Sequence, residues 1–445
     1  MALSGLEIYK LLPKTNCREC GFPTCLAFAL SLAKKAVSLE KCPYVSPAAK
    51  EALDAQSQPP IKLVLIGDDK NKTEVGNETV MFRHEEKFHH PTAIGFIIED
   101  GLSDENIKQR LDKISGLQFE RVGQLLKTEL IAIKQAGEGK RFVEAVKLIS
   151  GLVSSAIVLI SDDTAALSEA LKVLAGRRPL IYAAGSNNLS EFIGLAKEHN
   201  VPLALRPESL EEIPELTKKA NEAGMKDLVI DINTRNQNAR VIWELTQVRR
   251  QALKKVNRAL GYPAIAVMDR LLNSYEEVVK AGDYIAKYAA IVLLNGFEEW
   301  AVLALLTLRQ NIYTDPQKPL QIEPKLYPIG NTGETSPVLV TTNFSLTYYT
   351  VLGEVEASKV PTYILSVNTE GMSVLTAWAA EKFTPDKISE GLKKSGLEEK
   401  VKHRNLIIPG YVAVMSGDLE EKSGWKIIVG PKEAAGIPTF LKNLS

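Results

Sequence analysis

The sequence predicts a multidomain α/β protein with a small cysteine-containing module, a central (β/α)8 barrel of the TIM type and a C-terminal Rossmann-like domain. Three observations predict this order. All four cysteines lie in the first tenth of the 445 residues, short apolar runs alternate with amphipathic stretches in the middle, and four apolar runs near the C-terminus each lead into a loop of small residues. We expect the domains to cover residues 1–58, 59–322 and 323–445.

The N-terminal module is predicted from Cys17, Cys20, Cys25 and Cys42, which form the pattern CxxCxxxxCx16C. Four thiolates can hold a zinc ion, an iron–sulfur cluster or two disulfides. Three cysteines in one loop, with a proline directly after the fourth, favour a [4Fe-4S] cluster over zinc, whose sites usually use two separated pairs. Nothing at the N-terminus resembles a signal peptide, which argues against disulfides. A helix is expected over residues 26–37.

The overall composition bounds the kind of partner. Lys and Arg together number 54, as do Asp and Glu, so no global field attracts nucleic acid or an anionic membrane. No apolar run approaches the roughly 20 residues of a membrane-spanning helix. We therefore expect a cytoplasmic protein with neither nucleic acid nor a membrane among its partners.

A polar, proline-containing segment at residues 55–60 marks the first domain boundary. Residues 61–67 and 79–83 are predicted to form two strands of a hairpin across a turn that contains Gly76 and Asn77. This hairpin would lead into the second domain.

The middle of the chain alternates β-branched runs with amphipathic stretches, which fits a (β/α)8 barrel better than an open sheet. The predicted strands are residues 93–98, 117–122, 156–160, 179–183, 202–205, 227–232, 263–268 and 290–294. The predicted helices are residues 104–114, 164–174, 189–199, 210–223 and 242–260.

Polar residues directly after the barrel strands would face the C-terminal end of the barrel, where such a ring could bind a substrate. Each of them could equally cap the helix that follows, and for any single residue the cap is the preferred interpretation. The ring consists of Glu99, Asp100, Ser161, Asp162, Asp163, Arg206, Asp231, Asn233, Asp269 and Asn295.

The C-terminal domain begins after a loop rich in Pro, Gly and Asn at residues 317–333. Its four apolar runs end in loops that would meet at the carboxyl edge of one parallel sheet, where doubly wound folds bind cofactors. Gly371, Gly410, Gly430 and Gly436 would let a large flat cofactor approach the backbone. The alternative of ordinary turn glycines and helix caps stays open, because no phosphate-binding glycine fingerprint is present here. The runs are residues 338–340, 363–367, 406–408 and 425–429, with helices predicted over 345–357 and 374–382.

The segment 17–25 with Cys42, the barrel-like middle and the loop 369–373 together resemble the large (gamma) subunit of the corrinoid iron–sulfur protein family of the anaerobic acetyl-CoA pathway. The resemblance implies a [4Fe-4S] module, a barrel and a Rossmann-like domain that binds a corrinoid (cobamide). It implies the four cysteines as cluster ligands. The corrinoid contacts that it implies are Thr341, Thr342, Asn343, Leu346, Thr369, Glu370, Gly371, Met372, Ser373, Val374, Gly410, Tyr411, Val412, Ala413, Gly430, Pro431, Ala434, Ala435 and Gly436.

Many B12 proteins use a DxHxxG loop whose histidine binds cobalt, but that motif is absent from the C-terminal domain. Its single histidine is His403, and Val401 stands where the motif requires Asp. This agrees with a family that holds its cobamide base-off without a protein histidine ligand. Loss of a strong axial donor makes Co(II) easier to reduce to Co(I).

The resemblance implies a methyl-group carrier that takes part in methyl transfer without being a complete enzyme. Its cobalt would cycle between Co(I) and methyl-Co(III), accepting methyl from methyltetrahydrofolate through a separate methyltransferase and passing it to acetyl-CoA synthase/CO dehydrogenase. The cluster would return Co(II) to Co(I). Further implied partners are a small barrel subunit, forming a heterodimer, and a reductive activator or ferredoxin.

Two alternatives from other classes remain open. The barrel could itself be a pterin-dependent methyltransferase, with Asp162, Asp231 or Asn233 holding the pterin. The chain could also be an iron–sulfur electron-transfer protein that binds no corrinoid.

Overall fold

The computed structural model describes residues 5–33, 37, 39–46, 49, 59–232 and 240–444. Within these residues, no helix has the length and apolar character needed to cross a bilayer. The chain divides into two compact units, and each is described by itself. The first comprises Met1–Met81, Phe88–Ile114 and Glu129–Ala301, and the second comprises Phe82–Lys87, Ser115–Thr128 and Val302–Ser445.

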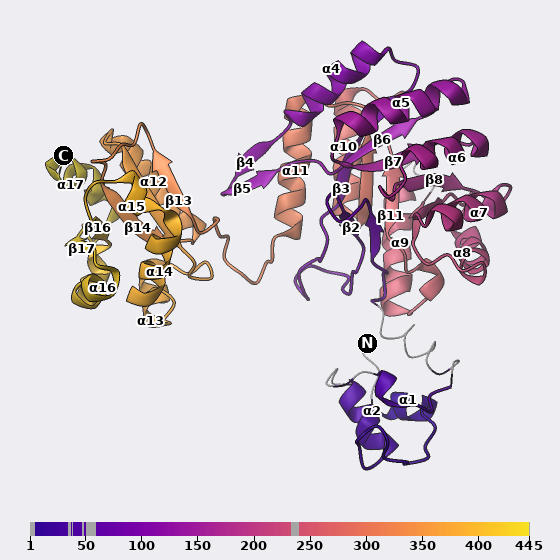
Figure 1. The fold of residues 1–445 in the computed structure, drawn as a ribbon, viewed down its shortest axis with the longest axis horizontal. Coiled ribbons are helices and arrows are strands. Elements are labelled where there is room, and N and C mark those ends of the chain that lie inside the picture. Colours follow the sequence, from indigo (N-terminus) through magenta and orange to yellow (C-terminus); the bar gives the residue numbers. More distant parts are fainter. Residues whose placement is uncertain are drawn as a thin grey trace. The chain divides into compact units, whose positions relative to one another are not determined.

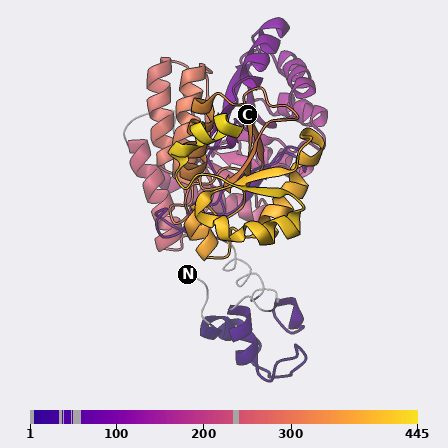
Figure 2. The ribbon, with the colours of Figure 1, turned by 90° about the vertical axis from the view of Figure 1, so that its left-hand side faces the viewer.

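Helices and turns make up the described residues of the N-terminal module, drawn in indigo in Figure 2. Its helices are α1 (Gly5–Leu11), α2 (Cys25–Ala33) and the 3-10 turn η1 (Leu39–Lys41). The predicted helix is confirmed through Ala33, while residues 34–36 lie outside the described residues. Ile8, Leu12, Phe28 and Ala29 form a small core with Cys25. A core of this size is typical of modules that a metal centre helps to organise.

An antiparallel hairpin of β1 (Val64–Ile66) and β2 (Thr73–Val75) follows. The prediction of a second strand over residues 79–83 is wrong. The ladder ends at Val75 because Gly76 and Asn77 both adopt left-handed backbone conformations, with φ of 89° and 58°. The buried side chains of both strands pack into the core of the barrel.

The central domain is a closed barrel of eight parallel strands in the order β10-β11-β12-β3-β6-β7-β8-β9, as predicted (Figure 1). Nearly all the strand residues are buried, which is typical of a parallel sheet covered by helices. The strands are β3 (Ala93–Glu99), β6 (Leu130–Lys134), β7 (Ala156–Ile160), β8 (Leu180–Ala184), β9 (Leu203–Leu205), β10 (Leu228–Asp231), β11 (Ala264–Val267) and β12 (Ala289–Leu294).

The barrel helices lie outside the strands (Figure 1). The five predicted helical stretches are confirmed, whereas α5, α10 and α11 were not predicted. The helices are α4 (Asp104–Ser115), α5 (Gly139–Leu152), α6 (Thr164–Val173), α7 (Leu189–His199), η2 (Leu210–Glu212), α8 (Ile213–Glu222), α9 (Arg240–Lys254), η4 (Arg258–Leu260), α10 (Ser274–Ala286) and α11 (Glu299–Tyr313).

The second predicted barrel strand, residues 117–122, is wrong. This segment contains β4 (Phe119–Arg121), which pairs with β5 (Gln124–Leu126) in a separate antiparallel hairpin. The turn between them begins at Val122, whose φ of 54° is typical of tight hairpin turns. The hairpin belongs to the second unit, where Val122 packs against the core of the C-terminal sheet. The buried strand β6 takes its place in the barrel.

The C-terminal sheet has five strands in the order β13-β15-β14-β16-β17. The four predicted strands are present and parallel, and the antiparallel edge strand β13 was missed. Helices cover both faces, with α14 and α16 packing on one and α12 and α17 on the other. The strands are β13 (Leu326–Ile329), β14 (Val338–Thr342), β15 (Thr362–Val367), β16 (Asn405–Ile408) and β17 (Lys426–Val429). The helices are α12 (Ser345–Ser358), α13 (Val374–Ala379), α14 (Pro385–Ser395), α15 (Leu397–Lys400), η5 (Gly410–Met415), α16 (Ser416–Ser423), η6 (Ala434–Gly436) and α17 (Ile437–Leu444).

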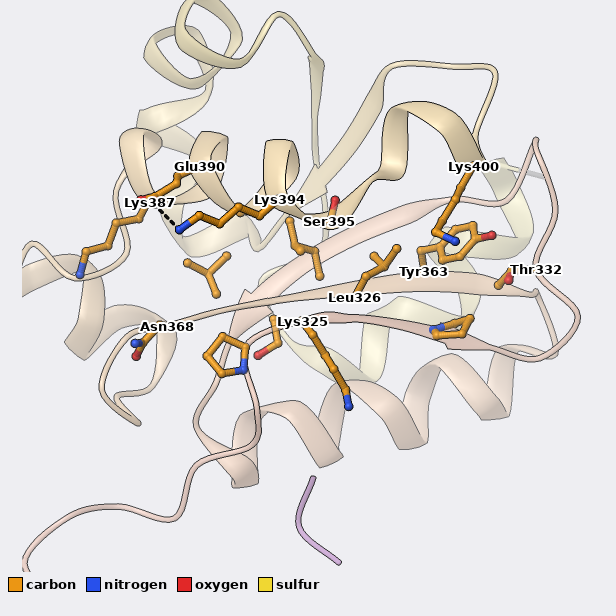
Figure 3. A pocket seen from close by; sticks show the side chains of 16 residues that line it. Lys325, Leu326, Thr332, Tyr363, Asn368, Lys387, Glu390, Lys394, Ser395 and Lys400 are labelled. Carbon is orange, nitrogen blue, oxygen red and sulfur yellow. Dashed lines mark hydrogen bonds and ion pairs between the residues drawn. The ribbon is translucent and has the colours of Figure 1, made fainter. Parts of the chain in front are cut away.

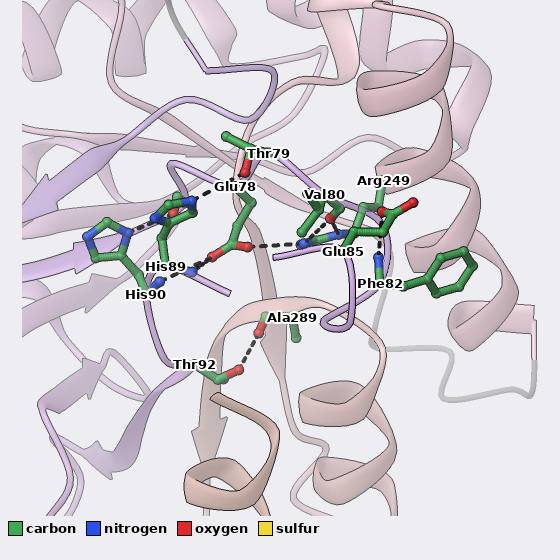
Figure 4. Close-up of polar contacts among 11 residues, drawn as sticks. Glu78, Thr79, Val80, Phe82, Glu85, His89, His90, Thr92, Arg249 and Ala289 are labelled. Carbon is green, nitrogen blue, oxygen red and sulfur yellow. Dashed lines mark hydrogen bonds and ion pairs between the residues drawn. The ribbon is translucent and has the colours of Figure 1, made fainter. Parts of the chain in front are cut away.

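A buried ion pair joins the segment after β2 to helix α9 (Figure 4). Arg249 is only 4% exposed, lies 3.0 Å from the Glu78 carboxylate and donates to the carbonyl of Val80. The same Glu78 carboxylate accepts the backbone N–H groups of His89 and His90 at 2.9 and 3.1 Å. Both charges are therefore satisfied, which is the condition for a buried pair to be tolerated.

Replacing Arg249 by methionine is expected to destabilise the barrel by about 3 kcal/mol, because the Glu78 carboxylate would remain buried without its cation. Denaturant unfolding of the purified protein measures this loss. Arg250→Met is the matched control, since Arg250 is exposed on the same helix. Equal stability of the two variants would contradict the assigned role of the pair.

Candidate functional site

The four cysteines are free thiols that belong to one small module. Cys25 is the first residue of α2 and is buried, Cys20 and Cys42 are partly buried, and Cys17 is exposed. Among the described residues, no three His, Cys, Asp or Glu side chains are close enough together to hold a single metal ion. Four thiols and no other strong ligand type in the pattern make up the donor set that iron–sulfur clusters use.

Asn16 connects the cysteine loop to the buried thiol. Its backbone N–H donates to the Sγ atom of Cys25 at 3.4 Å, and its side-chain oxygen accepts the backbone N–H of Cys25 at 2.8 Å. Asn16 adopts a left-handed conformation with a φ of 51°, which turns the chain toward α2. Hydrogen bonds to sulfur are one of the means by which proteins set the potential of iron–sulfur clusters.

Tyr44 connects the two ends of the cysteine pattern. Its hydroxyl donates to Glu19 at 2.7 Å, and this hydrogen bond raises the pKa of Tyr44. The charges of Cys17 and Cys42 raise that pKa further by smaller amounts. Both thiols therefore lie near the same phenol ring, although 25 positions separate them in the sequence.

The four predicted loops of the C-terminal domain meet at one edge of the sheet. β14 and β15 run in register to Thr342 and Val367, and β16 and β17 run in register to Ile408 and Val429. Because the strands are parallel, the loops that follow all leave from their carboxyl ends. The structure thus brings together the loops that the sequence predicted as a binding floor.

Asn343 faces inward at this edge and organises the loop after β15. Its side-chain oxygen accepts three hydrogen bonds, from the backbone N–H of Thr369 at 2.9 Å, the hydroxyl of Thr369 at 3.0 Å and the backbone N–H of Gly371 at 3.1 Å. Asn343 and Thr369 are both buried. These two expected cofactor contacts are therefore used to hold the loop in place.

Gln321 completes this edge and was not predicted. Its side-chain oxygen accepts from the Asn343 amide at 3.0 Å, and the backbone N–H of Ile322 donates to the Asn343 carbonyl at 2.9 Å. A Cβ atom on Gly371, whose φ is 77°, would lie 2.7 Å from the Gln321 side chain. The residue lies in an irregular loop with no periodic pattern, so no sequence signal marks it.

The loops after β16 and β17 pack against each other. The backbone N–H of Gly410 donates to the Pro431 carbonyl at 3.0 Å, and a Cβ atom on Gly410 would lie 2.6 Å from the carbonyl oxygen of Gly430. Tyr411 donates to Glu433 at 2.6 Å, and this hydrogen bond raises the pKa of Tyr411. Gly410 is thus required by the packing of the loops themselves, besides any role toward a ligand.

The remaining expected contacts differ in exposure. Glu370 is exposed and pairs with Lys382 at 2.6 Å, which lowers the pKa of the Glu370 carboxyl. Leu346, 67% exposed, and Tyr411 present apolar surface at the rim. Val412 is buried in the core, Ala435 is exposed, and Met372, Ser373, Val374, Ala413, Gly430, Pro431, Ala434 and Gly436 are half-buried.

Three buried hydroxyls near this edge make no hydrogen bond to any described residue: those of Thr341, Thr342 and Ser366. Thr341 and Ser366 are neighbours in register on adjacent strands, so both side chains lie on the same face of the sheet. An unpaired buried hydroxyl costs about 1–3 kcal/mol. The edge therefore fits a ligand that brings polar atoms and an apolar body, and Ser366 joins the predicted residues.

The barrel has its own cavity of about 640 Å³ at the carboxyl ends of its strands. Glu99 at its rim pairs with Lys134 at 3.2 Å and with Arg270 at 2.7 Å. The predicted ring residues that line this cavity are Ser161, Asp162, Asp163, Arg206, Asp269 and Asn295.

Other ring residues have structural roles. Asp163 caps α6 by accepting two backbone N–H groups, and Asp100 is buried and accepts the backbone N–H of Ala136 at 2.7 Å. Asp231 is buried and accepts from the Tyr182 hydroxyl, whereas Asp162 is mostly exposed. Asn233 lies outside the described residues. Asp162 and Asp231 are thus not presented together, as a shared pterin site would require.

Comparison with known families gives two matches. The family model for the CO dehydrogenase/acetyl-CoA synthase delta subunit matches residues 63–441. A model for an Fe-S cluster domain matches residues 12–44, which include all four cysteines.

Individual relatives match along the whole chain. The corrinoid/iron-sulfur protein large subunit of Moorella thermoacetica is 49% identical over 443 residues, which cover 99% of both chains. The acetyl-CoA decarbonylase/synthase complex subunit gamma of Methanothermobacter thermautotrophicus is 35% identical and covers 100% of both. Among solved structures, 7,8-dihydropteroate synthase from Vibrio fischeri matches with a TM-score of 0.40 and 15% identity, covering 57% of this chain and 100% of that one, a likeness too slight to carry an argument.

Proposed function

The chain belongs to the CO dehydrogenase/acetyl-CoA synthase delta subunit family, and from this we propose that it is a methyl-group carrier of the acetyl-CoA pathway. The observation that carries the proposal is the 49% identity with a corrinoid/iron-sulfur protein large subunit across 99% of both chains. Residues 1–58 form the cluster domain, residues 59–322 the barrel domain and residues 323–445 a Rossmann-like corrinoid domain.

Cys17, Cys20, Cys25 and Cys42 hold a [4Fe-4S] cluster in this proposal. Such a cluster transfers one electron at a time, and its role is to return cobalt that has been oxidised to Co(II) to the Co(I) state. The N–H of Asn16 that points at the Cys25 sulfur supports the assignment, because hydrogen bonds to sulfur stabilise a reduced cluster.

A base-off cobamide occupies the carboxyl edge of the C-terminal sheet. When bound, it supplies a cobalt centre whose Co(I) form is nucleophilic toward a methyl group. Thr341, Thr342 and Ser366 have unpaired hydroxyls that are available to its polar atoms, and the exposed side chains of Leu346 and Tyr411 offer apolar contact. Asn343 positions the loop after β15 beneath it.

His403 is not a lower cobalt ligand in this account. Both of its ring nitrogens have backbone partners, the carbonyl of Ser336 at 2.9 Å and the N–H of Asn405 at 3.2 Å. It also precedes β16, and so lies at the amino end of the strands, opposite the loops. A cobamide without a protein histidine follows, and its weaker axial donation favours reduction to Co(I).

The methyl group comes from methyltetrahydrofolate through a separate methyltransferase and leaves to acetyl-CoA synthase/CO dehydrogenase. A small barrel subunit forms a heterodimer with the chain, and a reductive activator or ferredoxin supplies electrons in the cytoplasm. The relative from Methanothermobacter, described as a subunit of a complex, supports the existence of such partners.

A methyl-transfer assay tests the function. The reduced holoprotein with its small subunit is expected to take up one methyl group per cobalt from methyltetrahydrofolate only when a methyltransferase is added. Methylation of free cobalamin by the chain alone would instead establish the alternative, a methyltransferase in its own barrel.

A further inference from the structure

A second cavity of the C-terminal unit lies between the edge strands β13 and β15 and helix α14 (Figure 3). Its volume is about 860 Å³, within the range of about 300–1,000 Å³ that small-molecule sites occupy. Leu326, Tyr363, Leu365 and Val367 give it an apolar wall. The cavity can therefore accept the body of an organic molecule.

The charged side chains around the cavity are mostly cations. Four lysines and one glutamate line it: Lys325, Lys387, Glu390, Lys394 and Lys400. Lys394 pairs with Glu390 at 2.5 Å, and Lys325 pairs with Glu323 at 2.8 Å. In the part of the chain that the structure describes, Lys387 and Lys400 make no ion pair. An excess of positive charge, including two uncommitted ammonium groups, thus faces the cavity.

The cavity is separate from the proposed cobamide edge. Tyr363, Leu365 and Val367 of β15 pack on the face that α14 covers. Ser366 alternates with them along the strand and points to the opposite face, as does Thr341. The unpaired hydroxyls and the lysines therefore lie on different faces of the sheet.

We propose that this cavity binds a small organic anion with two or more phosphate charges, of about the size of a nucleoside diphosphate. Lysine ammonium groups bind phosphate as point charges, and a net excess of cations requires a multiply charged ligand. Lys387 and Lys400 lie at opposite ends of the cavity in Figure 3, with Lys400 beside Tyr363 and Lys387 above Asn368. The phosphate groups are held by one lysine end, and the body of the ligand lies against the apolar wall.

Calorimetric titration of the anaerobic holoprotein with ADP, and separately with pyrophosphate, tests the proposal. Saturable binding of ADP is expected, tighter than that of pyrophosphate, because only ADP uses the apolar wall. In the double variant Lys387→Gln/Lys400→Gln the Kd for ADP is expected to rise at least about tenfold. Lys393→Gln is the matched control, because Lys393 is exposed on α14 but does not line the cavity. Its Kd is expected to equal that of the wild type.

Iron and cobalt content and thermal stability are expected to be the same in all these variants, since neither lysine is in an ion pair. Failure of the wild type to bind ADP saturably, or an unchanged Kd in the double variant, would overturn the proposal. Loss of cobalt from the double variant would overturn it differently, by assigning the cavity to the cofactor. Stronger binding of polyglutamate than of ADP would show a docking surface for an acidic protein in its place.

Discussion

Cys42→Ala is expected to abolish reductive reactivation while leaving methyl transfer by already reduced cobalt unchanged. The thiol is one of four ligands, and a cluster that lacks one ligand is lost or degraded in most chains, so iron and sulfide are expected to fall about tenfold. Cobalt content stays at the wild-type level, because the proposed cobamide site uses no residue of the cysteine module. Reactivation from Co(II) by a protein electron donor is expected to slow at least about a hundredfold.

Tyr44→Phe is the control for this experiment. It removes the hydrogen bond to Glu19, close to Cys17 and Cys42, without removing a thiol. Iron content and reactivation are expected to stay near the wild-type values. If Cys42→Ala reactivated as fast as Tyr44→Phe, the cluster would have no part in electron delivery to cobalt.

Asn343→Ala is expected to have the largest effect on the C-terminal domain. It would leave the backbone N–H groups of Thr369 and Gly371 and the hydroxyl of Thr369 without their shared acceptor. At about 1–3 kcal/mol for each buried unpaired group, the domain would lose about 3–6 kcal/mol. The loop after β15 would then no longer be held at the edge, and most chains are expected to purify without cobalt.

Asn343→Asp separates the acceptor from the rest of the side chain. Its carboxylate still accepts the three hydrogen bonds but cannot donate to Gln321. We expect it to retain most of the stability and most of the cobalt. Stability and cobalt content in Asn343→Ala equal to those in Asn343→Asp would contradict the positioning role, which unfolding curves and cobalt analysis measure together.

The barrel could be predicted because parallel strands covered on both faces appear as short apolar runs. One strand was misplaced because residues 117–122 and Leu130–Lys134 both have strand character, and local pattern cannot say which one pairs with β3. Only tertiary contacts decide this, since Val122 finds apolar partners in the second unit.

The site could be predicted at the level of loops but not of single side chains. Parallel topology alone brings the four loops to one edge, and the cysteine spacing alone marks the metal centre. Whether Asn343 points into the protein or toward a ligand depends on hydrogen bonds to residues 26 and 28 positions away. Ser366 lies inside a buried apolar strand, where a single hydroxyl gives no pattern, and its role emerges only from its register with Thr341.

The most direct test of the account is metal analysis and EPR spectroscopy of the anaerobically purified holoprotein. The account predicts iron, sulfide and cobalt together, a base-off Co(II) signal without nitrogen coupling from an axial ligand, and a cubane signal that appears on reduction. One equivalent of zinc without cobalt would contradict it, since the four cysteines would then hold a structural ion and the C-terminal edge would bind no corrinoid.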